Sequence, residues 1–296
     1  MDLRQLEYFQ IVGRLNSITK AAEQFHIAQP SVTVAIQKLE EELGVKLLDR
    51  SQRQITLTIE GKIFLQRVDD ILNRLQDSIR EMNDYRLLYK GSIKIGITPI
   101  IGAFIFPNVF ARFRERYPDF KLTFVEEGSL SIRRQLEQGK LDIGILIISN
   151  ISSRLATLPI TTGQIHVCLS SRHPLGSFSR IPFTELREYP FVLFKEDTYM
   201  RQIILEECAK NQFEPNIIFS SRQIETILGL VEQGVGIAFL LDAIVKKHAA
   251  ILSRPLVNPL LIQAGVAWNK DRYLSNAAKA FIDFAAEQYS ASRSSL

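Results

Sequence analysis

Residues 17–43, SITKAAEQFHIAQPSVTVAIQKLEEEL, decide the fold of the first part of this chain. Ser17 can cap a short helix that ends near Phe25, and Pro30 fits only in the first turn of a following helix, because proline has no N–H to donate. That following helix has one apolar stripe, formed by Val32, Ile36, Leu39 and Leu43. Two short helices joined by a tight turn are typical of a helix-turn-helix, although a plain three-helix bundle would show the same stripe.

The flanking segments favour DNA binding. Residues 2–14 have the spacing of an amphipathic helix, which completes a three-helix unit. Residues 46–50 and 54–58 are two extended runs on either side of a short turn, and they predict a hairpin wing with Arg50 and Arg53 near its tip. Basic wing tips of this kind can reach the minor groove or its phosphates.

The helix that starts near Pro30 has a second face, opposite its apolar stripe, and this face holds side chains suited to the major groove. Small or polar residues are needed at the leading end of such a helix, because backbone and base edges come close there. Gln29 can make a bidentate contact to adenine, and Lys38 can meet a phosphate. Val34 is either a contact to a thymine methyl group or a position shielded from DNA. The candidate DNA contacts of this helix are Gln29, Pro30, Ser31, Thr33, Val34 and Lys38.

A long helix is predicted over residues 59–90, which contain no proline and a single early glycine. One narrow apolar seam runs along it with the a/d spacing of a coiled coil, formed by Leu65, Val68, Leu72, Leu75, Ile79 and Met82. The seam could pack on the helix's own domain. Because the other faces are strongly polar, the sequence favours a partner helix and predicts dimerisation.

From Ser92 onward, short runs of β-branched residues alternate with helical segments, which is the pattern of βα units on a mixed or parallel sheet. The chain is therefore predicted to join a small helical module to a large α/β module. Cys168 and Cys208 lie far apart and have no metal-binding spacing. No P-loop, nucleophile elbow or HExxH motif occurs, so the sequence predicts neither an enzyme nor a cofactor.

The N-terminal residues resemble the winged helix-turn-helix of LysR-type transcriptional regulators. The matching positions are Ala21-Ala22, Gln29 to Thr33, Ile36, Leu39 to Val45, Leu47-Leu48, Arg50, Arg53, Leu57-Thr58 and Gly61. Val34 is a departure, because the family commonly has a polar or basic residue there. The resemblance extends over the whole chain and implies a ligand-responsive, sequence-specific regulator that binds double-stranded DNA at a dyad-symmetric operator. It also implies a homodimer, and members of the family commonly assemble further into tetramers.

The resemblance also implies a domain organisation. Residues 1–58 would form the winged helix-turn-helix, with the helix-turn-helix itself at about 18–37, and residues 59–90 would form the linker helix. Residues 92–289 would form a two-lobed α/β effector-binding domain similar to periplasmic binding proteins. Lobe I would comprise 92–161 and 265–289, lobe II would comprise 162–264, and a flexible tail would follow at 290–296.

Three predicted helix starts supply the candidate effector site between the lobes. Thr98 can cap one helix, Ser129 can cap a second over 130–138, and Thr198 precedes a third. The free N–H groups and positive dipole at helix starts favour an anion such as a carboxylate, although each residue could simply be an ordinary cap. With apolar neighbours included, the sequence predicts a small, partly apolar organic acid as effector, held by Thr98, Pro99, Ile100, Ser129, Ile147, Thr198 and Tyr199.

Charge and targeting features limit the remaining alternatives. The net charge of +4 suggests an acidic partner, but residues 1–90 hold 13 Lys plus Arg and 13 Asp plus Glu. The predicted DNA-binding module is thus close to neutral and should bind random DNA weakly.

A stand-alone solute-binding protein is the main competing function, but it would leave the first module unexplained. The N-terminus lacks the features of a secretory signal and no stretch is apolar enough to span a membrane, so a cytoplasmic location is expected.

Overall fold

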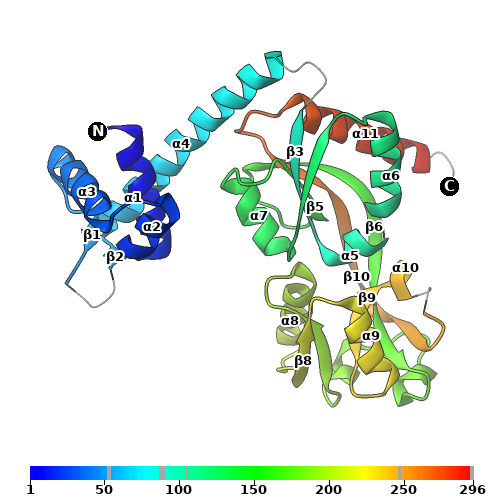
Figure 1. Cartoon of the computed structure of the whole chain (residues 1–296). Helices are drawn as coiled ribbons and strands as arrows, with labels where there is room; N and C mark the ends of the chain where they lie inside the picture. The colour runs from blue at the N-terminus through cyan, green and yellow to red at the C-terminus, as the bar shows by residue number, and fades with distance from the viewer. Residues whose placement is uncertain (52–54, 87–90, 105, 246–247, 294–296) are drawn as a thin grey trace. The chain divides into compact units, whose positions relative to one another are not determined.

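The computed structural model describes residues 1–51, 55–86, 91–104, 106–245 and 248–293, and the chain forms two compact units, Met1–Asn83 and Asp84–Leu296 (Figure 1). Each unit has its own hydrophobic core. The units are described separately below.

The first unit contains the predicted helix-turn-helix. Its helices and strands, in chain order, are α1 (Leu3–Leu15), α2 (Ile18–Phe25), α3 (Gln29–Leu43), β1 (Leu48–Asp49), β2 (Thr56–Leu57) and α4 (Ile59–Arg86). The hydroxyl of Ser17 accepts a hydrogen bond from the N–H of Lys20 and so caps α2, as predicted. Pro30 lies in the first turn of α3, and Gly44 ends that helix with a φ of +69°. β1 and β2 pair antiparallel and form the wing.

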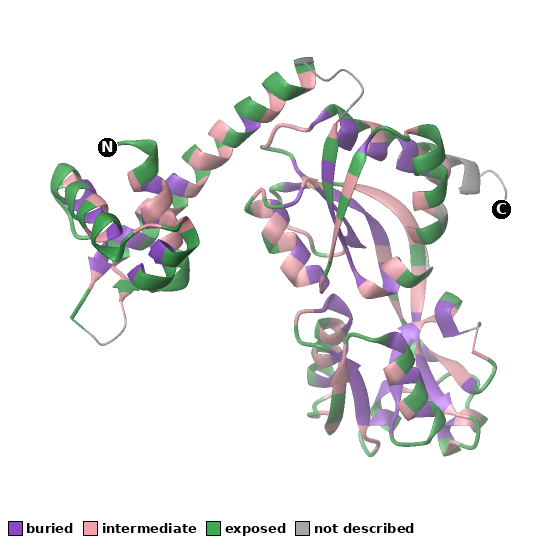
Figure 2. Cartoon of the chain, in the orientation of Figure 1, coloured by how far each residue is buried: buried purple, intermediate pink, exposed green. Residues whose placement is uncertain are grey.

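The core of the first unit lies between its helices (Figure 2). Three of the four predicted stripe residues of α3, Val32, Ile36 and Leu39, are completely buried, and the fourth, Leu43, is half-buried and packs against the same core. Phe9 and Val12 of α1 complete the core from the opposite side, and both are also completely buried. This packing turns the other face of α3 outward.

The second unit is built on a six-stranded mixed sheet with the strand order β4-β3-β5-β10-β6-β9. β3 (Ser92–Ile97) pairs parallel with β4 (Lys121–Glu126) and β5 (Ile143–Ile147). β10 (Ile251–Asn269) runs antiparallel to β5 and to β6 (Leu155–Ser170), and β9 (Ala238–Leu241) pairs with β6. A smaller parallel pair is formed by β7 (Phe191–Phe194) and β8 (Ile217–Ser221).

The long strands β6 and β10 run through both lobes of this unit (Figure 1). The predicted boundaries between the lobes, at 161/162 and 264/265, both lie inside these continuous strands. The register between the two strands shifts where Ala264 and Gly265 face Thr161 and Pro159, so the crossing contains a β-bulge. A Cβ atom on Gly265 would lie 2.3 Å from the carbonyl oxygen of Leu158, and only glycine fits there.

Helices cover the sheets of the second unit. They are α5 (Pro99–Phe104), α6 (Phe106–Arg116), α7 (Ser129–Glu137), α8 (Tyr199–Lys210), α9 (Ile224–Glu232), α10 (Asp242–Val245) and α11 (Asn276–Arg293), with short 3-10 helices at Pro174–Ser177 and Phe183–Leu186. The predicted start of α7 is wrong, because Ser129 is its first helical residue and Gly128 is the N-cap. The predicted start of a flexible tail at residue 290 is also wrong, because α11 extends to Arg293, and residues 294–296 lie outside the described residues.

Candidate nucleic-acid interface and ligand cavity

The outward face of α3 presents the predicted DNA contacts at its leading end. Gln29, Pro30, Ser31 and Lys38 are exposed. The side chain of Val34 belongs to the same face and is 48% exposed, so about half of it is accessible from outside the unit. The hydroxyl of Thr33 is half-buried and donates to the backbone oxygen of Gln29 at 3.2 Å, which leaves its lone pairs for a further partner. Polar atoms therefore gather where a helix would enter a groove.

Glu40 fixes the wing to α3, a role that sequence analysis missed. Its carboxylate is 2% exposed and accepts hydrogen bonds from the N–H groups of Leu47 (2.8 Å) and Leu48 (3.0 Å). The Nζ of Lys46 and a guanidinium nitrogen of Arg50 lie 3.4 and 3.7 Å from the same carboxylate. Spacing could have indicated this role, because Glu40 continues the i, i+4 row of Val32 and Ile36 into the core.

The base of the wing is held by a second set of hydrogen bonds. The hydroxyl of Thr58 donates to the backbone oxygen of Lys46 at 2.7 Å and accepts from the N–H of Gly61 at 2.9 Å. A Cβ atom at Gly61 would lie 2.0 Å from the backbone oxygen of Leu47, so glycine is required for this close approach. Arg50 is exposed at the end of β1, whereas Arg53 lies outside the described residues.

The predicted dimer seam of α4 divides into two parts. Val68 is completely buried in the core of its own unit, and Leu65 and Leu72 pack against that core. The prediction is therefore wrong for Val68, which has no surface left for a partner helix. Beyond Val68, a row of exposed apolar side chains remains at Ile71, Ile79 and Met82, and Leu75 between them is half-buried.

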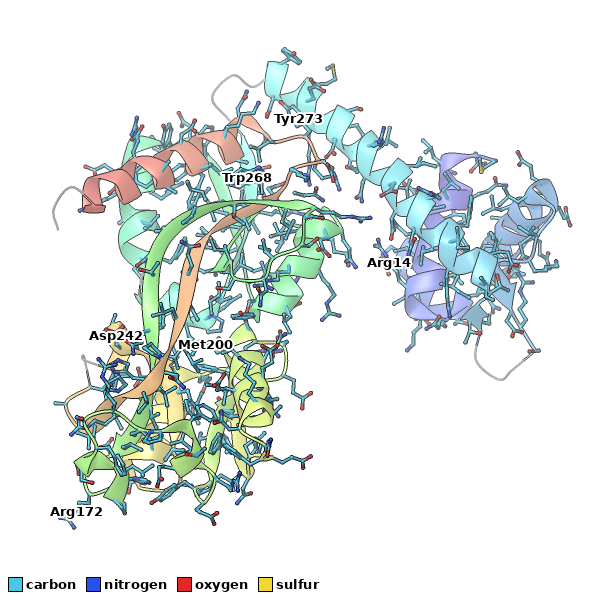
Figure 3. All side chains as sticks on the ribbon, turned by 180° about the vertical axis from the view of Figure 1, so that it is seen from behind. Arg14, Arg172, Met200, Asp242, Trp268 and Tyr273 are labelled. Atoms are coloured by element: carbon cyan, nitrogen blue, oxygen red, sulfur yellow. The ribbon has the colours of Figure 1, made fainter. Side chains whose placement is uncertain are left out.

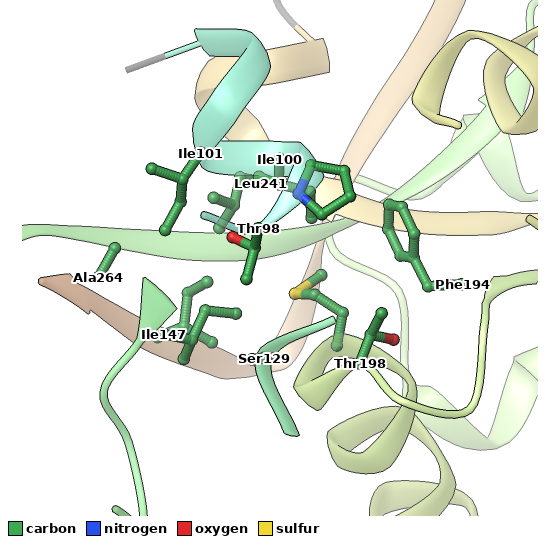
Figure 4. A pocket seen from close by; sticks show the side chains of 12 residues that line it. Thr98, Ile100, Ile101, Ser129, Ile147, Phe194, Thr198, Leu241 and Ala264 are labelled. Carbon is green, nitrogen blue, oxygen red and sulfur yellow. The ribbon is translucent and has the colours of Figure 1, made fainter. Parts of the chain in front are cut away.

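In the second unit, a cavity of about 30 Å³ lies where β5 ends and α5, α7 and α8 begin (Figure 4). Six of the seven predicted effector residues line it, namely Thr98, Pro99, Ile100, Ser129, Ile147 and Thr198. Tyr199 is not among the lining residues. The rest of the lining, which sequence analysis did not identify, is apolar: Ile101, Phe194, Met200, Leu241, Ile262 and Ala264. All lining residues are uncharged.

The hydroxyl groups at the cavity differ in what they bind. Thr198 caps α8 as predicted, accepting from the N–H of Arg201 at 3.3 Å and donating to the backbone oxygen of Lys195 at 2.7 Å. Ser129 does not cap its own helix. Its hydroxyl instead accepts from the N–H of Tyr199 at 2.9 Å and so connects α7 to α8. The sequence could not show this contact, because the two residues are 70 positions apart.

Arg133 of α7 binds the backbone next to the cavity, at and after the end of β5. Its guanidinium donates to the backbone oxygens of Ile147 (2.8 Å), Ser149 (2.6 Å) and Asn150 (3.1 Å), and it lies over the ring of Tyr199 at 5.1 Å from the centroid. Burial lowers the pKa of Arg133 from its usual high value. Arg133 thus fixes the backbone at the end of β5, where Ile147 lines the cavity.

Other site types find no support within the described ranges. No group of three His, Cys, Asp or Glu side chains there is arranged to hold a metal ion. The described helices are also too short or too polar for any of them to cross a bilayer.

Two protein-family models match the chain. Residues 3–62 match the model described as bacterial regulatory helix-turn-helix protein, lysR family. Residues 88–290 match the LysR substrate binding domain. Together the two matches cover both units.

Individual proteins and solved structures give the same result. The uncharacterised HTH-type transcriptional regulator YwbI of Bacillus subtilis is 34% identical over 286 residues, which cover 96% of this chain and 95% of that protein. HinK, a LysR family transcriptional regulator from Pseudomonas aeruginosa, has a TM-score of 0.59 at 26% identity, covering 97% of this chain and 98% of that one. Full-length CbnR in complex with its target DNA has a TM-score of 0.62 with 97% and 100% coverage, and at 19% identity it shows likeness of fold alone.

Proposed function

Because this chain belongs to the LysR family of bacterial transcriptional regulators, we propose that α3 reads the major groove of a dyad-symmetric operator in the cytoplasm. Membership of the family excludes the stand-alone solute-binding protein, which has no helix-turn-helix. The observation that carries the proposal is the two-sided character of α3. Val32, Ile36 and Leu39 of its apolar stripe are completely buried, while its leading end exposes polar side chains.

The residues of this face have separate roles in the proposal. Gln29 and Ser31 contact bases, and the exposed Val34 contacts a thymine methyl group. Thr33 already donates its hydroxyl proton to Gln29, so it accepts a hydrogen bond from a base. Lys38, Arg50 and Arg53 contact phosphates and hold the helix in register.

Binding measurements on paired variants test base reading. Gln29→Ala should weaken binding to the cognate operator by about 1–3 kcal/mol and leave binding to random DNA almost unchanged. Lys38→Ala is the matched control on the same helix face, and it should weaken binding to both DNAs alike. Equal loss on both DNAs for Gln29→Ala would refute base reading.

We also propose that the exposed row of α4 pairs with the same row of a second copy. The pairing residues would be Ile71, Leu75, Ile79 and Met82, which lie within about a third of a turn of one another on the helix. Two-fold pairing would present two α3 helices to the two operator half-sites.

For the cavity, we propose a small effector that combines an apolar body with one carboxylate. The apolar lining favours the body, and the hydroxyl of Thr98, with the backbone amides at the nearby helix starts, favours an anionic group. Calorimetric titration with matched acids and alcohols of aromatic, aliphatic and sugar type tests this. Binding of only polyhydroxylated compounds would refute the apolar body, and equal binding of acids and alcohols would refute the carboxylate.

A further inference from the structure

The cavity is too small for an organic effector while its walls stay in place. Its volume of about 30 Å³ leaves room for one to a few water molecules, whereas sites for small organic ligands have roughly 300–1,000 Å³. Ser129 and Ile147 come from lobe I, and Thr198 and Met200 come from lobe II (Figures 3 and 4). Entry of an effector therefore requires the lobes to separate.

Three hydrogen bonds cross between the lobes beside the cavity, from the start of α7 to the start of α8. The N–H of Gly128 donates to the carboxylate Oδ2 of Asp197 at 3.2 Å, and the N–H of Leu130 donates to the backbone oxygen of Asp197 at 3.1 Å. The N–H of Tyr199 donates to the hydroxyl of Ser129 at 2.9 Å. We call these five residues the interlobe latch. All three bonds must break when the helix starts move apart.

Arg222 holds the Asp197 carboxylate in the latch. A guanidinium nitrogen of Arg222 donates to the same Oδ2 at 2.8 Å, so this oxygen is shared between the two lobes. Burial by itself raises the pKa of the Asp197 carboxyl, but the hydrogen bond and charge of Arg222, together with the Gly128 amide, lower it below its usual value. Asp197 is therefore ionised at neutral pH.

The closed latch also leaves one polar atom unsatisfied. The Oδ1 of Asp197 is buried and accepts no hydrogen bond from the part of the chain that the structure describes. A carboxylate oxygen removed from water without a donor is costly, and opening the lobes would return it to solvent. The latch thus balances favourable bonds at Oδ2 against this cost, which suits a closure that must open.

Gly128 makes the close approach of the two lobes possible. A Cβ atom at this position would lie 2.2 Å from the backbone oxygen of Asp197 and 2.6 Å from its carboxylate carbon. Its φ of −66° is accessible to every residue, so space is the reason that glycine is needed. An added methyl group would act as a wedge between the lobes.

We propose that the interlobe latch controls access to the cavity: Asp197 holds the lobes together, and an effector enters when the latch opens. The latch rests on the function proposed above in one respect only, namely that the cavity binds an effector. Asp197 acts here as a positioning residue, because it lies outside the cavity lining.

Hydrogen exchange of the full-length protein, followed by mass spectrometry without DNA or effector, tests the latch. Asp197→Asn keeps the shape of the side chain and removes its charge, and Gly128→Ala adds the wedge. The amides of Gly128, Leu130 and Tyr199 should exchange about tenfold faster in both variants, because a hydrogen bond to a charged group is lost or strained. The control is Gly229→Ala in α9, where an added Cβ meets nothing within 4 Å, and it should match the wild type. Unchanged exchange in Asp197→Asn would overturn the proposal. If Gly128→Ala does not fold, Arg222→Gln takes its place as the second variant.

A second measurement follows the opening from inside the cavity. Met200 is 2% exposed and lines the cavity, so the thiol introduced by Met200→Cys should react with a thiol reagent only when the lobes separate. Adding Asp197→Asn should speed this reaction about tenfold, and equal rates would overturn the latch. Failure of the proposed function would show instead as absence of ligand or operator binding, with both latch results unaffected.

Discussion

Replacing Glu40 by alanine tests how the wing is held to the recognition helix. The two buried N–H groups of Leu47 and Leu48 would lose the carboxylate oxygen that accepts from them at 2.8 and 3.0 Å. A buried donor left without a partner costs about 1–3 kcal/mol, so the two together predict a loss of about 2–4 kcal/mol after partial relaxation. The contact to Lys46 adds little, because that side chain is largely exposed.

Urea unfolding of the full-length protein can separate this effect from the rest of the chain. Trp268 is the single tryptophan and lies on β10 of the second unit (Figure 3), so its fluorescence follows that unit. Far-UV circular dichroism also follows the helices of the first unit. Glu40→Ala should shift the dichroism transition to lower urea and leave the Trp268 transition in place.

The neighbouring glutamates provide the control. Glu41 is exposed, so Glu41→Ala should change the free energy of unfolding by no more than about 0.5 kcal/mol. Glu40→Gln keeps one oxygen that can accept a hydrogen bond and should lose roughly half of the alanine effect. Equal destabilisation by Glu40→Ala and Glu41→Ala would refute the account of the buried carboxylate.

Three further predictions concern the remaining features. Ile79→Asp should dissociate the dimer in sedimentation experiments without lowering stability, whereas Val68→Asp should destabilise the first unit by at least about 3 kcal/mol, because it buries an unpaired charge; the reverse order would contradict the division of α4. Burial raises the pKa of Cys168 and of Cys208 to about 12, so neither thiol should react with an aromatic disulfide reagent at pH 8 faster than the protein unfolds; rapid labelling of the native protein would contradict this. Because the pKa of Asp197 is lowered in the folded protein, its contribution to the latch is full above the ordinary carboxyl pKa and is lost as the pH falls through the lowered value. Exchange of the Gly128 amide, corrected for the intrinsic rate, should therefore be constant from neutral to mildly acidic pH and rise only below about pH 4. A rise near pH 6 would contradict this role of Asp197.

The helix-turn-helix could be predicted because its signals are local. Ser17 caps α2 within three residues, Pro30 marks the start of α3, and the stripe of α3 repeats with the helical period. The cavity residues could be predicted for a related reason, because Thr98, Ser129 and Thr198 each stand where a helix starts after the end of a strand, which is where ligands bind in α/β folds. Six of the seven predicted residues line one cavity.

The remaining features depend on contacts between distant parts of the chain. Glu40 belongs to an acidic run, and although its i, i+4 spacing from Val32 and Ile36 indicates that it points inward, its two N–H partners belong to the folded wing and follow from no local pattern. Ser129 has the position of a cap, but the amide it binds belongs to Tyr199. The lengths of β6 and β10 could not be predicted either, because proline usually ends a strand. Pro159 and Pro255 instead lie inside these strands, at the two places where the register between them shifts.

The central claim is that a ligand in the cavity of the second unit controls operator binding by the first. The most direct test takes an acid that binds in calorimetry and measures operator affinity and footprint with and without it, in the wild type and in Ile147→Phe, which fills the cavity. The wild type should change its operator affinity by about fivefold or more, or change the length of its footprint, while Ile147→Phe should bind the operator and not respond. An acid that binds the wild type yet leaves both affinity and footprint unchanged would contradict the claim.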